Sequence, residues 1–145
     1  MELMFPADYV PQEGERINLY QELDNMERET DVMAFRNRLQ DRFGKIPKEA
    51  QELIRIVTLR RLARSLGIEK ISLKQEKMYL YFVSDDNIAY YQSSAFGRIL
   101  NFLQNNPRRC QLREIRGRRS MVISDISTVE EAVSILSTTS TLESI

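Results

Sequence analysis

Few side chains in this chain could take part in catalysis. The sequence has no histidine, the commonest acid–base group at neutral pH, and one cysteine, Cys110. Cys110 lies in a pattern typical of a strand, and we expect a small buried side chain there, because no histidine is available to activate it. Asp85 and Asp86 are adjacent, but turn chemistry explains them better than an acid–base pair. Since phosphate-binding glycine motifs and Cys/His ligand sets are also missing, the residue types predict no catalytic, metal or cofactor-binding site.

Charge is distributed unevenly along a chain whose formal net charge is zero. Acidic residues dominate residues 13–31, and arginines dominate residues 108–119, which we call the basic hairpin. The arginines of the basic hairpin are Arg108, Arg109, Arg113, Arg116, Arg118 and Arg119. They fit a phosphate-binding surface, and an independent nucleic-acid-binding module is therefore the alternative function. A solvated hairpin with a charge-protected edge explains them more simply, since no aromatic residue is interleaved to stack bases.

A third charged feature is Asp41, in a stretch that reads as a helix end. Gly44 supplies the left-handed conformation of a helix C-terminus, which places Asp41 in the last turn. The helix dipole disfavours an anion there by up to about 1 kcal/mol. Either Arg42 or Lys45 compensates locally, or Asp41 points outward toward a cationic partner.

The elements of the first half follow from the spacing of apolar residues. Residues 1–12 contain two prolines and suit an extended edge segment that looks like the cut end of a longer chain. Apolar periodicity predicts a helix over residues 14–27 and a second helix that begins at an N-cap, Thr30. A third helix over residues 47–66 has apolar residues over more than half its circumference, which predicts the central helix of the core.

The second half changes to the period of strands. A hairpin turns at Gln75-Glu76-Lys77, a helix starts after Ser93 or Ser94, and a second hairpin turns near Arg116-Gly117. The pattern Ser127-x-x-Glu130 predicts the cap of a last helix, which we expect to fray over residues 137–145. Three helices followed by hairpin, helix, hairpin and helix make one α+β domain over residues 1–145, with a mainly antiparallel sheet packed by helices.

Composition limits the class of protein further. The chain has 145 residues, 42% of them hydrophobic and 29% charged, which is typical of one soluble globular domain. It contains no apolar run long enough for a membrane span and no signal peptide. A single cysteine fits the reducing cytoplasm. These observations indicate a non-enzymatic interaction module but do not identify its partner.

Four motifs in order carry a resemblance to a known family. The motifs are Phe5-Pro6-x-x-Tyr9-Val10-Pro11, Arg16-x-x-Leu19-Tyr20, Leu39-x-Asp41-Arg42-Phe43-Gly44-x-Ile46-Pro47 and Ala63-Arg64-x-Leu66-Gly67-Ile68-x-Lys70. Through them the chain resembles the C-terminal domain of bacterial transcription-repair coupling factor, in its first half above all.

The resemblance implies a regulatory role inside a larger motor. In that family an ATP-dependent DNA translocase, whose motor domains bind ATP and magnesium, displaces stalled RNA polymerase and recruits excision repair. The C-terminal domain has no cofactor of its own. It packs on a UvrB-like module of the same parent chain and masks the surface that recruits UvrA. The implied function is therefore autoinhibition through a protein interface.

The resemblance also implies which residues form that interface. In the family, acidic residues around this helix end face arginines of the UvrB-like module, and Asp41 matches that pattern. Arg42 and Lys45 would form the rim. One turn earlier, where the family often has another acid, this chain has Arg38, so Asp31 or Glu27 is expected to contribute instead.

Overall fold

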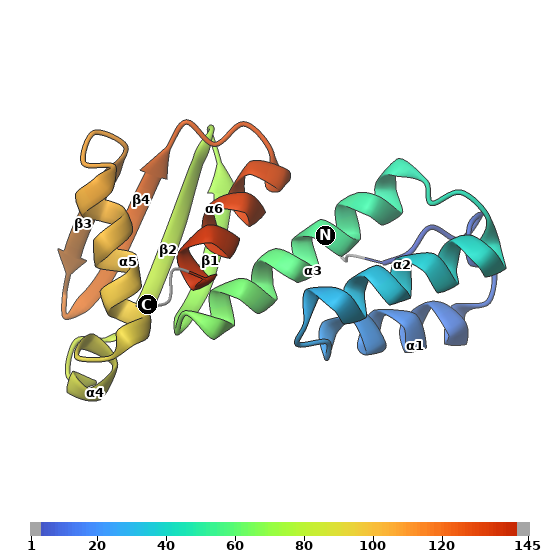
Figure 1. Cartoon of the computed structure of the whole chain (residues 1–145), viewed down its shortest axis with the longest axis horizontal. Helices are drawn as coiled ribbons and strands as arrows, with labels where there is room; N and C mark the ends of the chain where they lie inside the picture. Colours follow the sequence, from blue (N-terminus) through green and yellow to red (C-terminus); the bar gives the residue numbers. More distant parts are fainter. Residues whose placement is uncertain (1–3, 142–145) are drawn as a thin grey trace. The chain divides into compact units, whose positions relative to one another are not determined.

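The structure, a computed structural model, describes residues 4–141, which form six helices and one four-stranded antiparallel sheet (Figure 1). The predicted α+β class and element order are confirmed. The chain divides into two compact units, residues 1–61 and residues 62–145, which we call the helical unit and the sheet unit. None of the helices within residues 4–141 is both long and apolar enough to cross a membrane.

The helical unit contains α1 (Glu13–Asp24), α2 (Glu29–Phe43) and most of α3 (Lys48–Ser65). Its core forms because the apolar residues of α2 recur at helical spacing and meet those of α3. The α2 residues in this core are Val32, Phe35 and Leu39, and the α3 residues are Ala50, Leu53, Ile54 and Val57.

The segment before α1 folds into a turn, so the predicted extended edge segment is wrong. The backbone amides of Tyr9 and Val10 both donate to the carbonyl oxygen of Pro6, at 3.1 and 2.9 Å. This turn lets Phe5 and Val10, which are 2% and 0% exposed, enter the helical core. Burying these two apolar side chains stabilises the helical unit. An extended strand would gain no hydrogen-bonded neighbour, because the helical unit contains no sheet.

The ends of α2 differ in how well the sequence predicted them. The helix starts at Glu29 with Arg28 at the N-cap, so Thr30 is not the cap. No side chain caps the helix, but Glu29 and Asp31 supply negative charge in the first turn, which the helix dipole favours, and Glu29 also pairs with Arg61 at 3.2 Å. At the other end Gly44 has a φ of +86°, which confirms the predicted positive φ, although its ψ of −169° is extended rather than helical.

The sheet unit has the strand order β1-β2-β4-β3. The strands are β1 (Ile68–Lys74), β2 (Lys77–Ser84), β3 (Cys110–Ile115) and β4 (Arg118–Ser124). The helices are α4 (Ile88–Tyr91), α5 (Ser94–Asn105) and α6 (Val129–Thr141). Figure 1 shows α5 and α6 on the same face of the sheet. The Phe96 ring of α5 meets the Phe82 ring of β2 edge-on at 5.5 Å, which fixes that face as the core face.

Both predicted hairpin turns are confirmed. Gln75 and Glu76 have φ values of 52° and 59°, and Arg116 and Gly117 have values of 54° and 75°. Positive φ at both central residues is the geometry that matches the right-handed twist of the flanking strands. The predicted cap of α5 is also confirmed, because the hydroxyl of Ser93 accepts a hydrogen bond from the amide of Phe96.

Two expectations for the sheet unit are corrected, and one short helix was missed. Thr128 and not Ser127 caps α6, since the Thr128 hydroxyl accepts from the Glu131 amide at 3.1 Å. The helix continues through residues 137–141, where the Thr139 hydroxyl donates to the carbonyl of Ile135 and satisfies a buried polar group. Residues 142–145 of the expected frayed tail lie outside the described residues. Helix α4, capped by the side chain of Asn87, was not predicted because four residues are too short for a periodicity signal.

Candidate functional site

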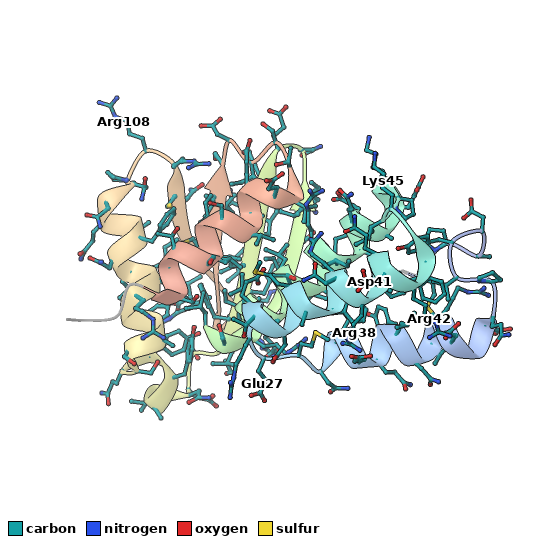
Figure 2. The ribbon with its side chains drawn as sticks, turned by 45° about the vertical axis from the view of Figure 1, so that its right-hand side comes forward. Glu27, Arg38, Asp41, Arg42, Lys45 and Arg108 are labelled. Carbon is teal, nitrogen blue, oxygen red and sulfur yellow. The ribbon has the colours of Figure 1, made fainter. Side chains whose placement is uncertain are left out.

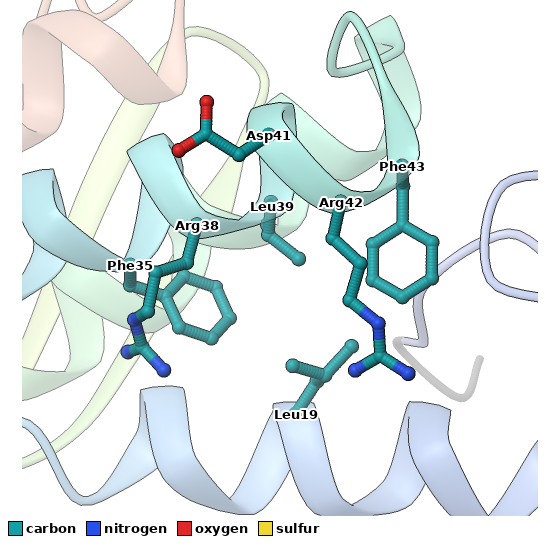
Figure 3. Close-up of a pocket in the computed structure, with 7 residues that line it drawn as sticks. All are labelled: Leu19, Phe35, Arg38, Leu39, Asp41, Arg42 and Phe43. Carbon is teal, nitrogen blue, oxygen red and sulfur yellow. The ribbon is translucent and has the colours of Figure 1, made fainter.

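Asp41 lies in the last turn of α2, where its carboxylate is exposed. Within residues 4–141 it forms no ion pair or hydrogen bond through its side chain. Figure 3 shows the carboxylate pointing away from the guanidinium groups of Arg38 and Arg42, which both extend toward α1. The anion therefore stands alone at the end of the helix that disfavours it.

Arg38 and Arg42 are engaged inside the helical unit. Arg38 pairs with Glu22 of α1 and Arg42 pairs with Glu15 of α1. The side chains of both arginines are more than half exposed, so each pair contributes at most about 1 kcal/mol. Arg42 therefore binds α1 rather than compensating the neighbouring Asp41.

A hollow of about 300 Å³ lies beside these residues. Its lining consists of apolar side chains from α1 and α2 together with the charged residues at the end of α2 (Figure 3). The lining residues are Leu19, Phe35, Arg38, Leu39, Asp41, Arg42 and Phe43. Apolar and charged side chains thus line the hollow together, as they do in many protein interfaces.

The end of α2 is held firmly by the segment before α1. The hydroxyl of Tyr9 donates to the carbonyl oxygen of Gly44 at 2.7 Å and, more weakly, to that of Leu39 at 3.2 Å. Its ring lies 5.6 Å from the ring of Phe43. Burial raises the pKa of Tyr9 above its ordinary value, which by itself already keeps the hydroxyl protonated at neutral pH. Asp41 is thus presented from a fixed helix end.

The other residues of the predicted interface divide between the two ends of α2. Lys45 is exposed just beyond Gly44, near Asp41 and Arg42. Asp31 lies ten residues before Asp41, roughly 15 Å away along the axis. Glu27 lies in the α1–α2 connection, and Figure 2 shows it well apart from Lys45. Asp41, Arg42 and Lys45 are therefore neighbours in sequence at the end of α2, but the Arg42 side chain extends toward α1 and away from the Asp41 carboxylate, and Asp31 and Glu27 are not brought to them.

Sequence reasoning missed the exposed face of α2 that leads to Asp41. Thr30, Ala34, Asn37 and Asp41 fall within about 60° of one another around the helix, and all four are exposed. Met33 borders them and is 58% exposed. The signal was present in the sequence, since Met33 falls outside the apolar stripe of α2. We call these five residues the α2 face. Its small side chains leave room for close approach of another chain.

The basic hairpin is less available than its sequence suggests. The Nε of Arg109 donates to the Ser124 carbonyl at 2.9 Å, and Arg118 pairs with Glu69 at 3.4 Å. Arg119 lies 4.2 Å from the centre of the Tyr91 ring and 3.6 Å from the Glu114 carboxylate. Arg113 donates to the side chain of Gln111.

The other two arginines of the basic hairpin, Arg108 and Arg116, have no side-chain partner within residues 4–141. Figure 2 shows Arg108 extending into solvent from the connection after α5. Two free arginines at opposite ends of a strand do not make a compact phosphate site.

The buried titratable groups take part in packing and hydrogen bonding within the fold. Cys110 is 9% exposed, and burial raises its thiol pKa, which confirms the expected buried side chain. Burial also raises the pKa of Tyr90, assisted by Tyr91, and its hydroxyl donates to the Leu66 carbonyl at 2.7 Å. Burial lowers the pKa of Arg36, with a further contribution from Arg55. Among residues 4–141, no three His, Cys, Asp or Glu side chains are grouped to hold a metal ion.

Comparisons with known proteins agree on one family. The transcription-repair-coupling factor of Escherichia coli strain K12 is 27% identical over 88 residues, which cover 61% of this chain and 8% of that protein. The protein of the same name from Rickettsia prowazekii is 27% identical over 103 residues, which cover 71% of this chain and 9% of that protein. The chain thus spans less than a tenth of the length of these relatives.

The fold agrees with a solved structure over nearly the whole chain. The crystal structure of a C-terminal domain of transcription-repair coupling factor superposes with a TM-score of 0.72 at 14% identity. The superposition covers 97% of this chain and 87% of that one, so the shared fold extends to the sheet unit. The family model for the TRCF domain matches residues 1–93, and the chain therefore belongs to the TRCF domain family.

Proposed function

We propose that this chain is a non-catalytic, autoinhibitory docking domain of a transcription-repair coupling factor. It packs on the UvrB-like module of its parent chain and masks the surface that recruits UvrA. Its release accompanies engagement of stalled RNA polymerase by the motor domains, which bind ATP and magnesium. DNA is contacted through the motor, and the setting is the cytoplasm.

The observation that carries the proposal is the isolated carboxylate of Asp41. An anion in the last turn of a helix costs a few tenths of a kcal/mol to about 1 kcal/mol, and no described side chain offsets it. Such an unfavourable group is accounted for if it pairs with an arginine of a docked partner, where the carboxylate accepts a bidentate hydrogen bond. The exposed α2 face next to it supplies the adjoining contact area.

The modest size of this face fits a tethered partner. The α2 face is polar or small apart from Met33, and interfaces between domains of one chain are commonly of this polar kind. Tethering gives an effective concentration on the order of millimolar for short flexible linkers, so a weak contact is enough to stay closed. A weak contact also opens readily when the motor changes state.

The arginines near Asp41 have a supporting role in this proposal. Because Arg38 and Arg42 already bind α1, they hold α2 in place and leave Asp41 as the charge offered to the partner. Lys45 lies at the rim, where charges affect association rates more than affinity. Asp31 and Glu27 would reach the partner only through a contact that extends along α2.

Titration of this chain with the isolated UvrB-like module tests the proposal. Asp41→Lys is expected to raise the dissociation constant about tenfold or more at low salt. Asp86→Lys, which makes the same charge change at an exposed site of the sheet unit, is the matched control and should leave binding unchanged. An arginine-to-glutamate change on the partner should restore binding to Asp41→Lys. Equal affinity of the wild type and Asp41→Lys would contradict the proposal.

A further inference from the structure

The sheet has a second face that the helices of its own unit do not cover. Side chains alternate along β2, so Met78, Leu80 and Phe82 point to the core face, and Tyr79 and Tyr81 point to the other. Figure 1 shows α5 and α6 together on one face of the sheet. We call the opposite face, which carries Tyr79 and Tyr81, the open sheet face.

The strand register aligns aromatic and basic residues in rows across the open sheet face. One row runs Ser72, Tyr79, Val122 and Gln111, and the next runs Lys70, Tyr81, Ser120 and Arg113. The basic hairpin lacks aromatic residues of its own, but the pairing of β4 with β2 sets two tyrosines on the same face as Arg113. Val122 is buried between its neighbours, which gives the face an apolar floor beside the Tyr79 ring.

The open sheet face carries an excess of positive charge. Its basic residues are Lys70, Lys74, Lys77, Arg113 and Arg118, and Glu69 pairs with one of them, Arg118, at 3.4 Å. Lys74 and Lys77 stand directly opposite each other in the β1–β2 ladder. Like charges directly opposite each other destabilise a sheet, so this lysine pair lowers the stability of the fold. A bound anion would relieve the repulsion between the two ammonium groups.

Lysines lie over both tyrosine rings. The Lys70 ammonium is 5.7 Å from the centre of the Tyr81 ring, and the Lys74 ammonium is 5.2 Å from that of Tyr79. All the lysines are exposed, so their ammonium groups can move to phosphate oxygens and leave the rings to bases without any backbone change. The two rings are residues i and i+2 of one strand, roughly 7 Å apart, which gives each ring its own base.

We propose that the open sheet face binds single-stranded nucleic acid, with bases stacked on Tyr79 and Tyr81 and phosphates on Lys70, Lys74 and Arg113. Aromatic residues on a four-stranded sheet beside basic side chains are a general solution for binding unpaired bases. Duplex nucleic acid does not fit, because its bases are already stacked. This site is independent of the α2 face and does not rest on the docking function.

Fluorescence anisotropy with labelled oligo(dT), oligo(U) and a duplex tests the proposal on the 145-residue chain at low salt. We expect a dissociation constant for single strands of about 10⁻⁶–10⁻⁴ M at physiological salt, the range of sequence-independent binding, and tighter binding at low salt. Tyr79→Leu and Tyr81→Leu, which keep an apolar side chain, should each weaken binding about fivefold or more. Lys70→Gln together with Arg113→Gln should lower the salt slope by roughly 0.7 for each lost phosphate contact, with the folded state checked by circular dichroism.

A matched control separates this site from the basic hairpin. Arg108→Gln with Arg116→Gln removes two charges from the hairpin ends, outside the rows of the open sheet face, and should change single-strand affinity less than twofold. Preference for oligo(U) or oligo(dT) would identify the sugar that the site accepts. Absence of single-strand binding at low salt, duplex binding as tight as single-strand binding, or loss of binding in the Arg108/Arg116 variant with both tyrosine variants unaffected would each overturn the proposal.

Discussion

Replacing Asp41 with asparagine separates a docking residue from a structural one. In the folded chain the carboxylate has no described partner, so the change breaks no hydrogen bond or ion pair. It removes an unfavourable interaction with the helix dipole, worth about 0.3–1 kcal/mol at an exposed site. The expected net effect of Asp41→Asn is therefore a gain of about 0.3–1 kcal/mol in the free energy of unfolding.

Urea denaturation followed by circular dichroism measures this difference. Glu15→Gln is the matched comparison, since it removes a carboxylate that does pair, with Arg42, and should lower the free energy of unfolding by about 0.2–1 kcal/mol. Both differences should shrink as salt is added, because both sites are near the surface. If Asp41→Asn instead lowers the free energy of unfolding by more than about 1 kcal/mol, the carboxylate supports the fold and the reasoning fails.

Two further predictions concern the packing of Tyr90 in the sheet unit. A Cβ at Gly67 would lie 2.1 Å from Cε1 of Tyr90 on a backbone whose φ is +72°, so Gly67→Ala should destabilise the chain by about 1–3 kcal/mol in a urea melt. Gly44→Ala has open space around the new Cβ, but its φ of +86° and ψ of −169° lie in a region that essentially only glycine adopts, so it should also cost about 1–3 kcal/mol, from backbone strain alone. No loss of stability in Gly67→Ala would contradict the steric argument. Because burial raises the pKa of Tyr90, the unfolded chain loses this proton first, and stability should fall as the pH rises above about 10, the ordinary tyrosine pKa. Tyr90→Phe should flatten that fall in denaturation curves recorded from pH 9 to 11, and an unchanged slope would show that Tyr90 does not cause it.

The order of elements was predictable because each depends on local signals. The apolar residues of α3 repeat at helical spacing, and Gly117 allows the positive φ that the second hairpin turn requires. The predictions that were wrong, for the N-terminal segment and the end of α6, failed because tertiary contacts determine the structure there. Phe5 and Val10 are drawn into the helical core, and burial of Thr139 keeps α6 helical through serine and threonine residues of low helix propensity.

The sites were predictable only where they depend on one element. Gly44 placed Asp41 at a helix end, as the structure has it. The pairing of Arg42 with Glu15 crosses two helices and leaves no local trace. The alignment of Tyr81 with Arg113 depends on β2 pairing with β4, since hairpin patterns fix neighbours within each hairpin and not the order in which hairpins join.

The central claim is that this domain hides a surface of its parent protein. The most direct test measures the affinity of UvrA for the intact coupling factor, for the factor carrying Asp41→Lys, and for the factor without this domain. The account predicts weak binding to the intact protein, tighter binding to Asp41→Lys, and the tightest binding after removal of the domain. Equal UvrA affinity for all three proteins would contradict it.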